Sequence, residues 1–170
     1  MSAPGRAAPG HAVLDRAAIE RFLVAEAELL DRGDYTAWLD LFADDGWYWV
    51  PLAPDQPDPD DHVSLFYENK ALMRMRIERL AHPRAHGVAR PIRTSRVVGN
   101  VVLDAAAADA NRLVARSRFH MAEVQDGRQR IFAGAYTHHL ATTPAGLRIR
   151  LKRVDLVNAD SPHEAMQVFI

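Results

Sequence analysis

Apolar residues recur at intervals of three and four positions between residues 15 and 31, and charged residues occupy most of the positions between them. This spacing places the apolar side chains on one face of a helix. Gly33 follows, and glycine readily adopts the left-handed backbone that often ends a helix. The pattern therefore predicts an amphipathic helix over Asp15–Asp31, whose core face is formed by Ile19, Phe22, Leu23, Ala27 and Leu30.

A shorter pattern follows between residues 34 and 52 and contains all three tryptophans of the chain. Asp34 is suited to cap a helix, because its carboxylate can accept hydrogen bonds from the free amides of the first turn. Trp38, Leu41 and Phe42 then recur at helical spacing. The sequence Asp44-Asp45-Gly46 interrupts them, and the large side chains of residues 47–50 favour a strand. The segment predicts a short helix, an acidic turn and a strand.

The pattern then changes from helical to alternating. Residues 51–61 are rich in proline and aspartate and predict a loop, and the spacing over His62–Leu80 predicts a second long helix. Apolar and polar residues alternate after residue 91, as in strands with one buried face. The predicted strands are 93–103, 112–124, 130–141 and 147–157, with a hairpin turn at 125–128. Helices followed by hairpin-linked strands predict an α+β fold, with helices on one face of a curved antiparallel sheet.

Composition narrows the class of protein. The chain has 170 residues, enough for one domain with a substantial core, and that domain is predicted to span 15–170 behind a flexible arm at 1–14. The formal net charge of −1 gives no basic excess for binding nucleic acid or a membrane surface. No apolar run approaches the roughly 20 residues that cross a bilayer, and the N-terminus lacks the apolar centre of a signal peptide. A cytoplasmic location is expected.

The absence of cysteine removes a further set of functions. Disulfides, thiolate nucleophiles and cysteine-held iron–sulfur clusters are all excluded from this chain. The histidines form no ligand pattern, because Pro83 disfavours placing His82 and His86 on one helical face and the adjacent His138 and His139 face opposite sides of a strand. We therefore expect no metal or cofactor site in this chain.

Two interpretations remain open for the acidic turn. In the first, the chain is a free-standing isomerase or dehydratase in which Asp44 or Asp45 moves a proton together with a histidine such as His86. In the second, adjacent aspartates before a glycine form a turn and stay in water. Neighbouring residues of an extended segment point apart, which favours the structural interpretation.

Basic residues form two patterns that could be solvated or could contact an acidic partner, a role to which arginine is well suited. The predicted second long helix carries Arg74, Arg76 and Arg79. Regular alternation places Arg148, Arg150 and Lys152 on one face of the last strand. The apolar end of the chain, Ala165–Ile170, is predicted to add a strand to the sheet or to dock on a neighbouring subunit.

Four stretches of the chain resemble the small (beta) subunit of bacterial aromatic-ring-hydroxylating, Rieske-type dioxygenases. The first runs from Glu26 through the aspartates of the acidic turn to Pro51, and the second is the basic segment Arg74–Leu80. The third is the arginine-rich strand Arg93–Val101, and the fourth is Lys152–Asn158 with the apolar tail that follows. The order and spacing of these stretches cover the chain from about residue 18 to its last residue.

The resemblance implies a cone-shaped NTF2-like (cystatin-like) fold and a non-catalytic, structural role. Such subunits scaffold alpha subunits, commonly as α3β3 hexamers, and the alpha subunit carries the Rieske [2Fe–2S] cluster and a mononuclear iron. The complex would add O2 to an arene to give a cis-dihydrodiol, with electrons from NADH or NADPH through a ferredoxin or reductase. The residues expected at the subunit interface are Arg74, Arg76, Arg79, Arg93, Arg96, Arg148, Arg150, Lys152 and Phe169. Besides the free-standing enzyme, a non-enzymatic dimerisation or binding module of the same fold remains an alternative.

Overall fold

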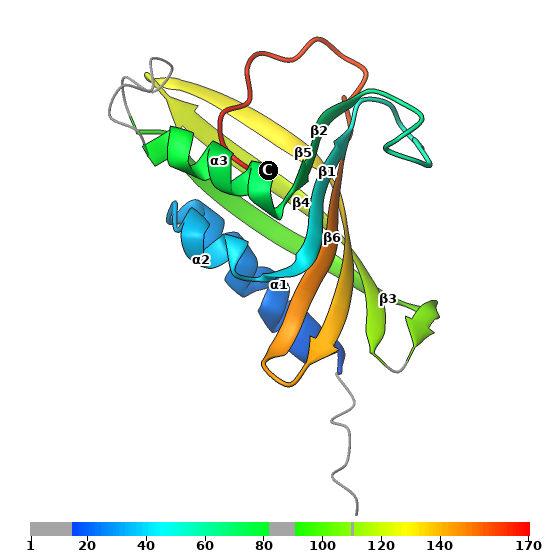
Figure 1. The fold of residues 1–170 in the computed structure, drawn as a ribbon. Helices are drawn as coiled ribbons and strands as arrows, with labels where there is room; N and C mark the ends of the chain where they lie inside the picture. Colours follow the sequence, from blue (N-terminus) through cyan, green and yellow to red (C-terminus); the bar gives the residue numbers. More distant parts are fainter. Residues whose placement is uncertain (1–14, 82–90, 110) are drawn as a thin grey trace, which may run out of the picture.

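The helices lie against the concave face of one strongly curved sheet (Figure 1). The structure is a computed structural model that describes residues 15–81, 91–109 and 111–170, without the side chains of 105–109. The predicted arm at 1–14 and the histidines at 82 and 86 lie outside these residues. The elements in chain order are α1 (Arg16–Asp31), α2 (Tyr35–Leu39), β1 (Phe42–Pro51), β2 (Ser64–Asn69), α3 (Lys70–Ala81), β3 (Arg93–Asp109), β4 (Arg112–Gln125), β5 (Arg128–Thr143) and β6 (Gly146–Leu156).

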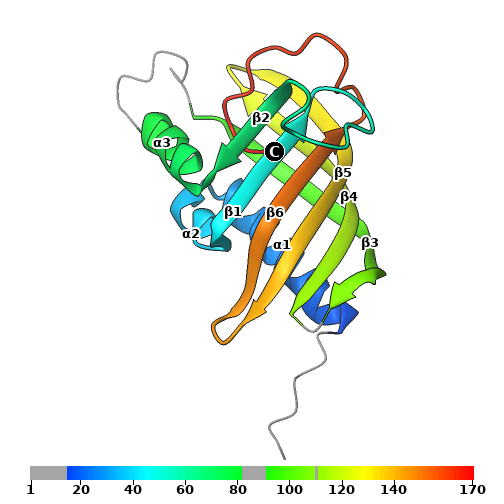
Figure 2. The same cartoon turned by 45° about the vertical axis from the view of Figure 1, so that its right-hand side comes forward.

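The strand order in the sheet is β2-β1-β6-β5-β4-β3. Neighbouring strands are antiparallel except β1 and β6, which run parallel. Figure 2, turned by 45° from Figure 1, shows the strands side by side with α1 behind them. The α+β prediction is confirmed. No helix in the described part of the chain is long and apolar enough to span a membrane.

The first two helices begin where their capping residues predict. The Ala18 amide donates to the Asp15 carboxylate at 2.7 Å, and the Ala37 amide donates to that of Asp34 at 3.2 Å. Both carboxylates satisfy amides that have no partner within the first helical turn. Ile19 and Leu23 on α1 and Trp38 on α2 are thereby turned into the core, where each is at most 1% exposed.

The second long helix is shorter than predicted. Residues 64–69 form strand β2, which pairs antiparallel with β1, and the helix begins only at Lys70. Two aromatic residues of β2, Phe66 and Tyr67, lie opposite Val50 and Trp49 of β1. Asn69 then accepts a hydrogen bond from the Leu72 amide at 3.0 Å and marks the start of α3. Pairing with an aromatic strand has overridden the helical spacing of this segment.

One residue of β6 interrupts the alternation of that strand. On β5, His139 pairs with Leu151 and the next residue, Leu140, pairs with Ile149, so Arg150 has no direct partner. Such a β-bulge reverses which residues face the core. Ile149 is buried before it and Lys152 is buried after it. The prediction that Lys152 shares a face with Arg148 and Arg150 is therefore wrong.

The chain after β6 forms no further strand. It crosses above the sheet and returns into the concave side, where its last residue lies between α3 and the sheet (Figure 1). Val168, Phe169 and Ile170 are 3%, 0% and 0% exposed. The apolar end thus packs into its own chain, and the prediction of an added strand is wrong.

Candidate functional site

The concave interior contains four polar side chains in mutual contact, Glu26, Trp38, His138 and Lys152, which we call the interior cluster. Glu26 Oε1 accepts from Trp38 Nε1 at 3.0 Å and lies 2.9 Å from Lys152 Nζ. Glu26 Oε2 lies 2.9 Å from His138 Nε2. None of the four residues is more than 2% exposed. The cluster joins α1 and α2 to β5 and β6.

The charged groups of the cluster stabilise one another electrostatically. Burial alone would raise the pKa of Glu26, but the charges of Lys152 and His138 and the hydrogen bonds from both outweigh it, so that this pKa lies far below its usual range. Burial lowers the pKa of Lys152, and the Glu26 carboxylate opposes that change. A carboxylate with three donors around it is held ionised and fixed in place.

Aromatic and apolar residues close the space around the cluster. Tyr136 stacks on Phe119 with ring centroids 4.0 Å apart, and Lys152 Nζ lies 4.4 Å from the centre of the Tyr136 ring. Burial raises the pKa of the Tyr136 hydroxyl far above its usual range. Charges that are paired and buried in this way fix the packing of helices on a sheet.

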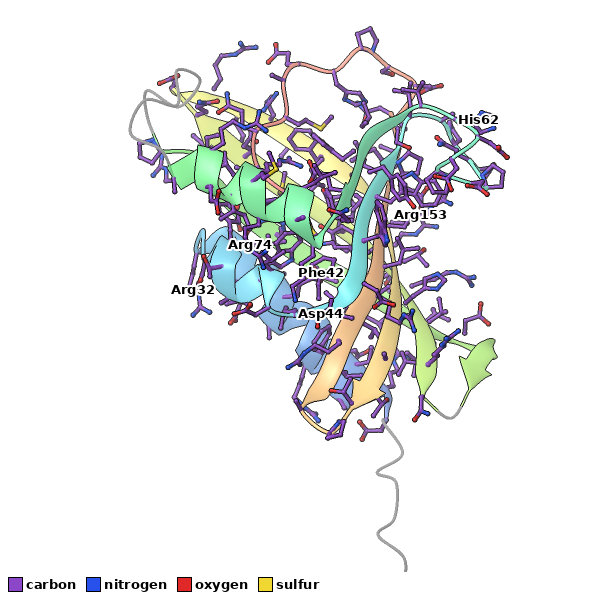
Figure 3. All side chains as sticks on the ribbon, viewed as in Figure 1. Arg32, Phe42, Asp44, His62, Arg74 and Arg153 are labelled. Carbon is purple, nitrogen blue, oxygen red and sulfur yellow. The ribbon has the colours of Figure 1, made fainter. Side chains whose placement is uncertain are left out.

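The residues predicted to form an acidic turn lie in strand β1 instead, so that prediction is wrong, and they do not belong to this interior. Asp44 is fully exposed and contacts Lys70 Nζ at 3.4 Å (Figure 3). Asp45 is mainly exposed and forms an ion pair with Arg150 on the outer side of β6. The third residue of the enzymatic interpretation, His86, lies outside the described residues. The two aspartates thus have separate surface partners and form no shared acid–base site.

The sequence contained a partial signal for the interior cluster. Glu26 falls on the buried stripe of α1, between Leu23 and Leu30, and His138 falls on the buried alternation of β5. A polar side chain on a buried face needs a polar partner, and each of these two faces carries one. Lys152 carried no such signal, because the β-bulge at Arg150 decides which way it points.

The outer face of the sheet carries an open hollow beside the β-bulge. Its volume is about 580 Å³, and its walls include Asp45, Trp47, Arg112, His139 and Arg150. Partial burial, with the nearby charges of Arg116 and His138, lowers the pKa of His139. The positively charged side chains that line the hollow are therefore Arg112, which is exposed, and Arg150, which is partly exposed.

The predicted interface residues divide into two groups. Arg74, Arg79 and Arg93 are exposed, and Arg148 and Arg150 are partly exposed. The other four, Arg76, Arg96, Lys152 and Phe169, lie inside this chain, with the Arg96 side chain 1% exposed and Phe169 fully buried. Only the first group remains available for a partner.

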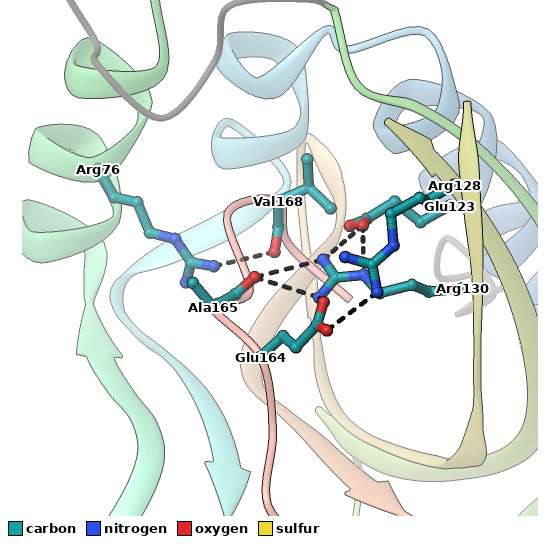
Figure 4. A network of polar contacts seen from close by, with 7 residues as sticks. All are labelled: Arg76, Glu123, Arg128, Arg130, Glu164, Ala165 and Val168. Carbon is teal, nitrogen blue, oxygen red and sulfur yellow. Dashed lines mark hydrogen bonds and ion pairs between the residues drawn. The ribbon is translucent and has the colours of Figure 1, made fainter. Parts of the chain in front are cut away.

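Three arginines instead hold the end of their own chain, and two of them, Arg76 and Arg130, are drawn in Figure 4. Arg76 donates to the Val168 carbonyl at 2.9 Å, and Arg130 donates to that of Ala165 at 3.3 Å. Arg96 donates to the Phe169 carbonyl. Acidic partners orient these side chains: Glu68 contacts Arg76, Asp31 contacts Arg96 and Glu123 contacts Arg130.

Among the described residues, no group of three or more histidine, aspartate or glutamate side chains is arranged to hold a metal ion. The ionisable residues of the interior cluster are instead occupied with one another.

Comparison with known proteins agrees with this geometry. The family described as ring hydroxylating beta subunit matches residues 25–161. The small oxygenase component of the p-cumate 2,3-dioxygenase system of Pseudomonas putida is 32% identical over 94% of this chain and 89% of its own length. The beta subunit of benzoate 1,2-dioxygenase from Burkholderia mallei superposes with a TM-score of 0.75 at 25% identity, over 91% of this chain and 97% of that one.

The fold has a wider distribution than this family. An NTF2-like protein with a cystatin-like fold from Novosphingobium aromaticivorans superposes with a TM-score of 0.57 at 20% identity, over 86% of this chain and 84% of that one. That likeness concerns the fold alone, and it confirms the predicted cone architecture.

Proposed function

This chain belongs to the family of ring-hydroxylating beta subunits, and we propose on that basis that it holds iron-bearing alpha subunits together in a dioxygenase that acts on an aromatic substrate. It is the small, structural component of the oxygenase, and it pairs with an alpha subunit. The family match through residues 25–161 is the observation that carries the proposal. The contacts of Glu26 with His138 and Lys152 agree with a structural role, since they fix helix α1 on the sheet.

The iron centres are proposed to belong to the alpha subunit. A Rieske [2Fe–2S] cluster needs two cysteine and two histidine ligands, and this chain has no cysteine. The cluster must therefore be held by another polypeptide, and we place the mononuclear iron on that polypeptide as well. Electrons from NADH or NADPH would reach it through a ferredoxin or reductase.

The contact surface for the alpha subunit is proposed to include the outward-facing arginines. These are Arg74, Arg79, Arg93, Arg148 and Arg150. Arginine binds carboxylates through two parallel hydrogen bonds, so an acidic partner surface would fit this set. The proposed assembly is an α3β3 hexamer.

Co-expression tests the proposal. The chain is produced together with a large oxygenase subunit from the same organism, and the mass and iron content of the purified species are measured. We expect one species that contains both chains in equal number and carries iron, while this chain produced alone carries none. A stable lone monomer that never co-purifies with an iron-bearing chain would contradict the proposal.

A further inference from the structure

The side chain of Phe169 occupies a site built from several elements of the cone. Its ring centre lies 4.4 Å from that of Trp38, 5.5 Å from that of Tyr48 and 5.7 Å from that of Tyr35. The guanidinium of Arg76 lies 4.3 Å from the centre of the Phe169 ring. We call these four residues the aromatic cage. Three rings and a cation around one ring are a geometry that binds aromatic groups well.

The walls of the cage are held by contacts that do not involve Phe169. Trp38 donates to Glu26 in the interior cluster, Tyr48 lies in the sheet opposite Glu68, and Arg76 forms an ion pair with that same Glu68 at 3.2 Å. Arg76 also lies over the ring of Phe66, 4.0 Å from its centre. Trp38 and the Arg76–Glu68 pair are therefore fixed independently of the Phe169 ring, while Arg76 and the Tyr48 hydroxyl also bond the backbone of the segment that carries it.

The segment that carries Phe169 is attached differently from the rest of the chain. Residues 162–170 belong to no helix or strand and take part in no backbone–backbone hydrogen bond in the described structure. Side chains hold it instead: the three arginines described above bind its carbonyls, and the Ile170 amide donates to the Tyr48 hydroxyl at 3.1 Å. A peptide bound in a groove is held in the same way, by side chains of the receptor.

We propose that the aromatic cage is a latent binding site for a small aromatic carboxylate, and that Phe169 occupies it as a tethered ligand. The ligand's ring takes the place of the Phe169 ring, between Trp38 and Tyr48. Its carboxylate displaces the backbone carbonyl of residue 169 and accepts from Arg96 in its place. This site is separate from the surface proposed for the alpha subunit, so either proposal can fail without the other.

The test uses the full chain with Phe169→Ala, which empties the cage. We expect 3-phenylpropionate at a hundredfold excess over its Kd to raise the melting temperature of this variant by roughly 5 °C, and to leave that of the unaltered chain unchanged. Propionate, which lacks the ring, should have no effect on either protein. Trp38 lies in the cage, so its fluorescence should report the same binding.

Phe132→Ala is the matched control. Phe132 is also buried and also lies beneath an arginine, with the Arg130 guanidinium 5.3 Å from its ring centre, but no described aromatic ring packs on it. Its loss should not create binding. Equal stabilisation of both variants, or none of the Phe169→Ala variant, would overturn the proposal.

If the Phe169→Ala variant does not fold, hydrogen exchange measured on the unaltered chain still tests the proposal. A tethered ligand must leave its site more readily than the sheet opens, so the Ile170 amide should exchange faster than the amides of β4 and β5. An Ile170 amide as slow as those of the sheet would show that the segment is a fixed part of the core and would refute the proposal.

Discussion

Glu26 is the residue on which the interior depends most directly. Its two carboxylate oxygens contact three side chains from three other elements, all within 3.0 Å. A buried ion pair adds little stability compared with an apolar pair, but removing one partner leaves a charge in the core without compensation. The consequence of a substitution therefore depends on which member of the pair remains.

Lys152→Met should show this asymmetry. The variant keeps the volume of the side chain but leaves the Glu26 carboxylate short of a cation, and we expect the free energy of unfolding to fall by about 3–5 kcal/mol in urea titrations. Arg16→Met, which breaks the exposed Arg16–Glu20 pair on α1, should cost at most about 0.5 kcal/mol. Similar losses in the two variants would mean that the cluster is not a charged network.

The low pKa of Glu26 predicts how stability depends on pH. A carboxyl whose pKa is lower in the folded state contributes stability above its unfolded pKa of about 4.3, and this contribution is lost as the pH falls below that value. We expect the unaltered chain to lose about 1.4 kcal/mol more per pH unit below roughly pH 4 than Glu26→Gln does. Urea titrations at pH 6, 4 and 3 would check this, and equal slopes for the two proteins would contradict it.

At the scale of single residues, the sequence indicated which positions face inward only where the alternation is uninterrupted. His138 could be placed on the buried face of β5 from its neighbours Tyr136 and Leu140. Phe169 and Arg96 could not be placed, because they meet through a segment that crosses the molecule outside any regular element. Contacts of that kind depend on the whole fold and leave no local pattern.

At the scale of elements, the close approach of β5 and β6 determines which side chains fit at the positions where the two strands meet. A Cβ atom at Gly134 would lie 2.0 Å from the Asp155 carbonyl oxygen, and the strand backbones would have to separate to admit it. A Cβ atom at Gly99, on the edge strand β3, would meet nothing within 4 Å. The two glycines form a matched pair, since neither has a positive φ.

Gly134→Ala is therefore expected to be far more damaging than Gly99→Ala. Overpacking a well-ordered interior costs roughly 1–3 kcal/mol and occasionally more, whereas alanine at the open position should be tolerated within about 0.5 kcal/mol. Chemical unfolding of both variants would measure the difference. A Gly134→Ala chain as stable as its counterpart would show that β5 and β6 can move apart freely.

Most elements were predictable from periodicity. Helices α1 and α2 and strands β4, β5 and β6 lie within a few residues of their predicted ends, whereas β1 begins already at Phe42 and so includes the predicted acidic turn, and β3 continues to Asp109. Strand β2 was missed, because its side chains are apolar at helical spacing while its partner β1 lies earlier in the chain. Pairing between segments decides such cases, and a local window cannot detect it.

At the scale of the whole molecule, the outer face of the sheet is the surface to test for assembly. We expect Arg150→Glu to weaken assembly with the alpha subunit by at least about tenfold, since it reverses a charge on the proposed contact surface. Analytical ultracentrifugation of the co-expressed chains would measure the change. The alternative is that the outer face is simply solvated, in which case assembly would be unaffected.

Asp45→Asn is the control for this variant. It breaks the same ion pair between Asp45 and Arg150 within the chain, but it leaves the positive charge of Arg150 in place. Assembly should therefore be retained. Equal losses for the two variants would trace the effect to the local ion pair, and the contact surface would then have to be sought elsewhere.

The β-bulge at Arg150 has a consequence for which side chains of β6 face the core. Before Arg150 the odd-numbered residues of β6 face inward, and after it the even-numbered residues do. This one extra residue lets a single strand keep Arg148 and Arg150 on the outer face and still turn Lys152 into the core. Deleting Arg150 would remove the bulge and leave Leu151 facing outward and Lys152 inward, as they are now, so the strand would lose one outward-facing arginine while its later residues kept their directions.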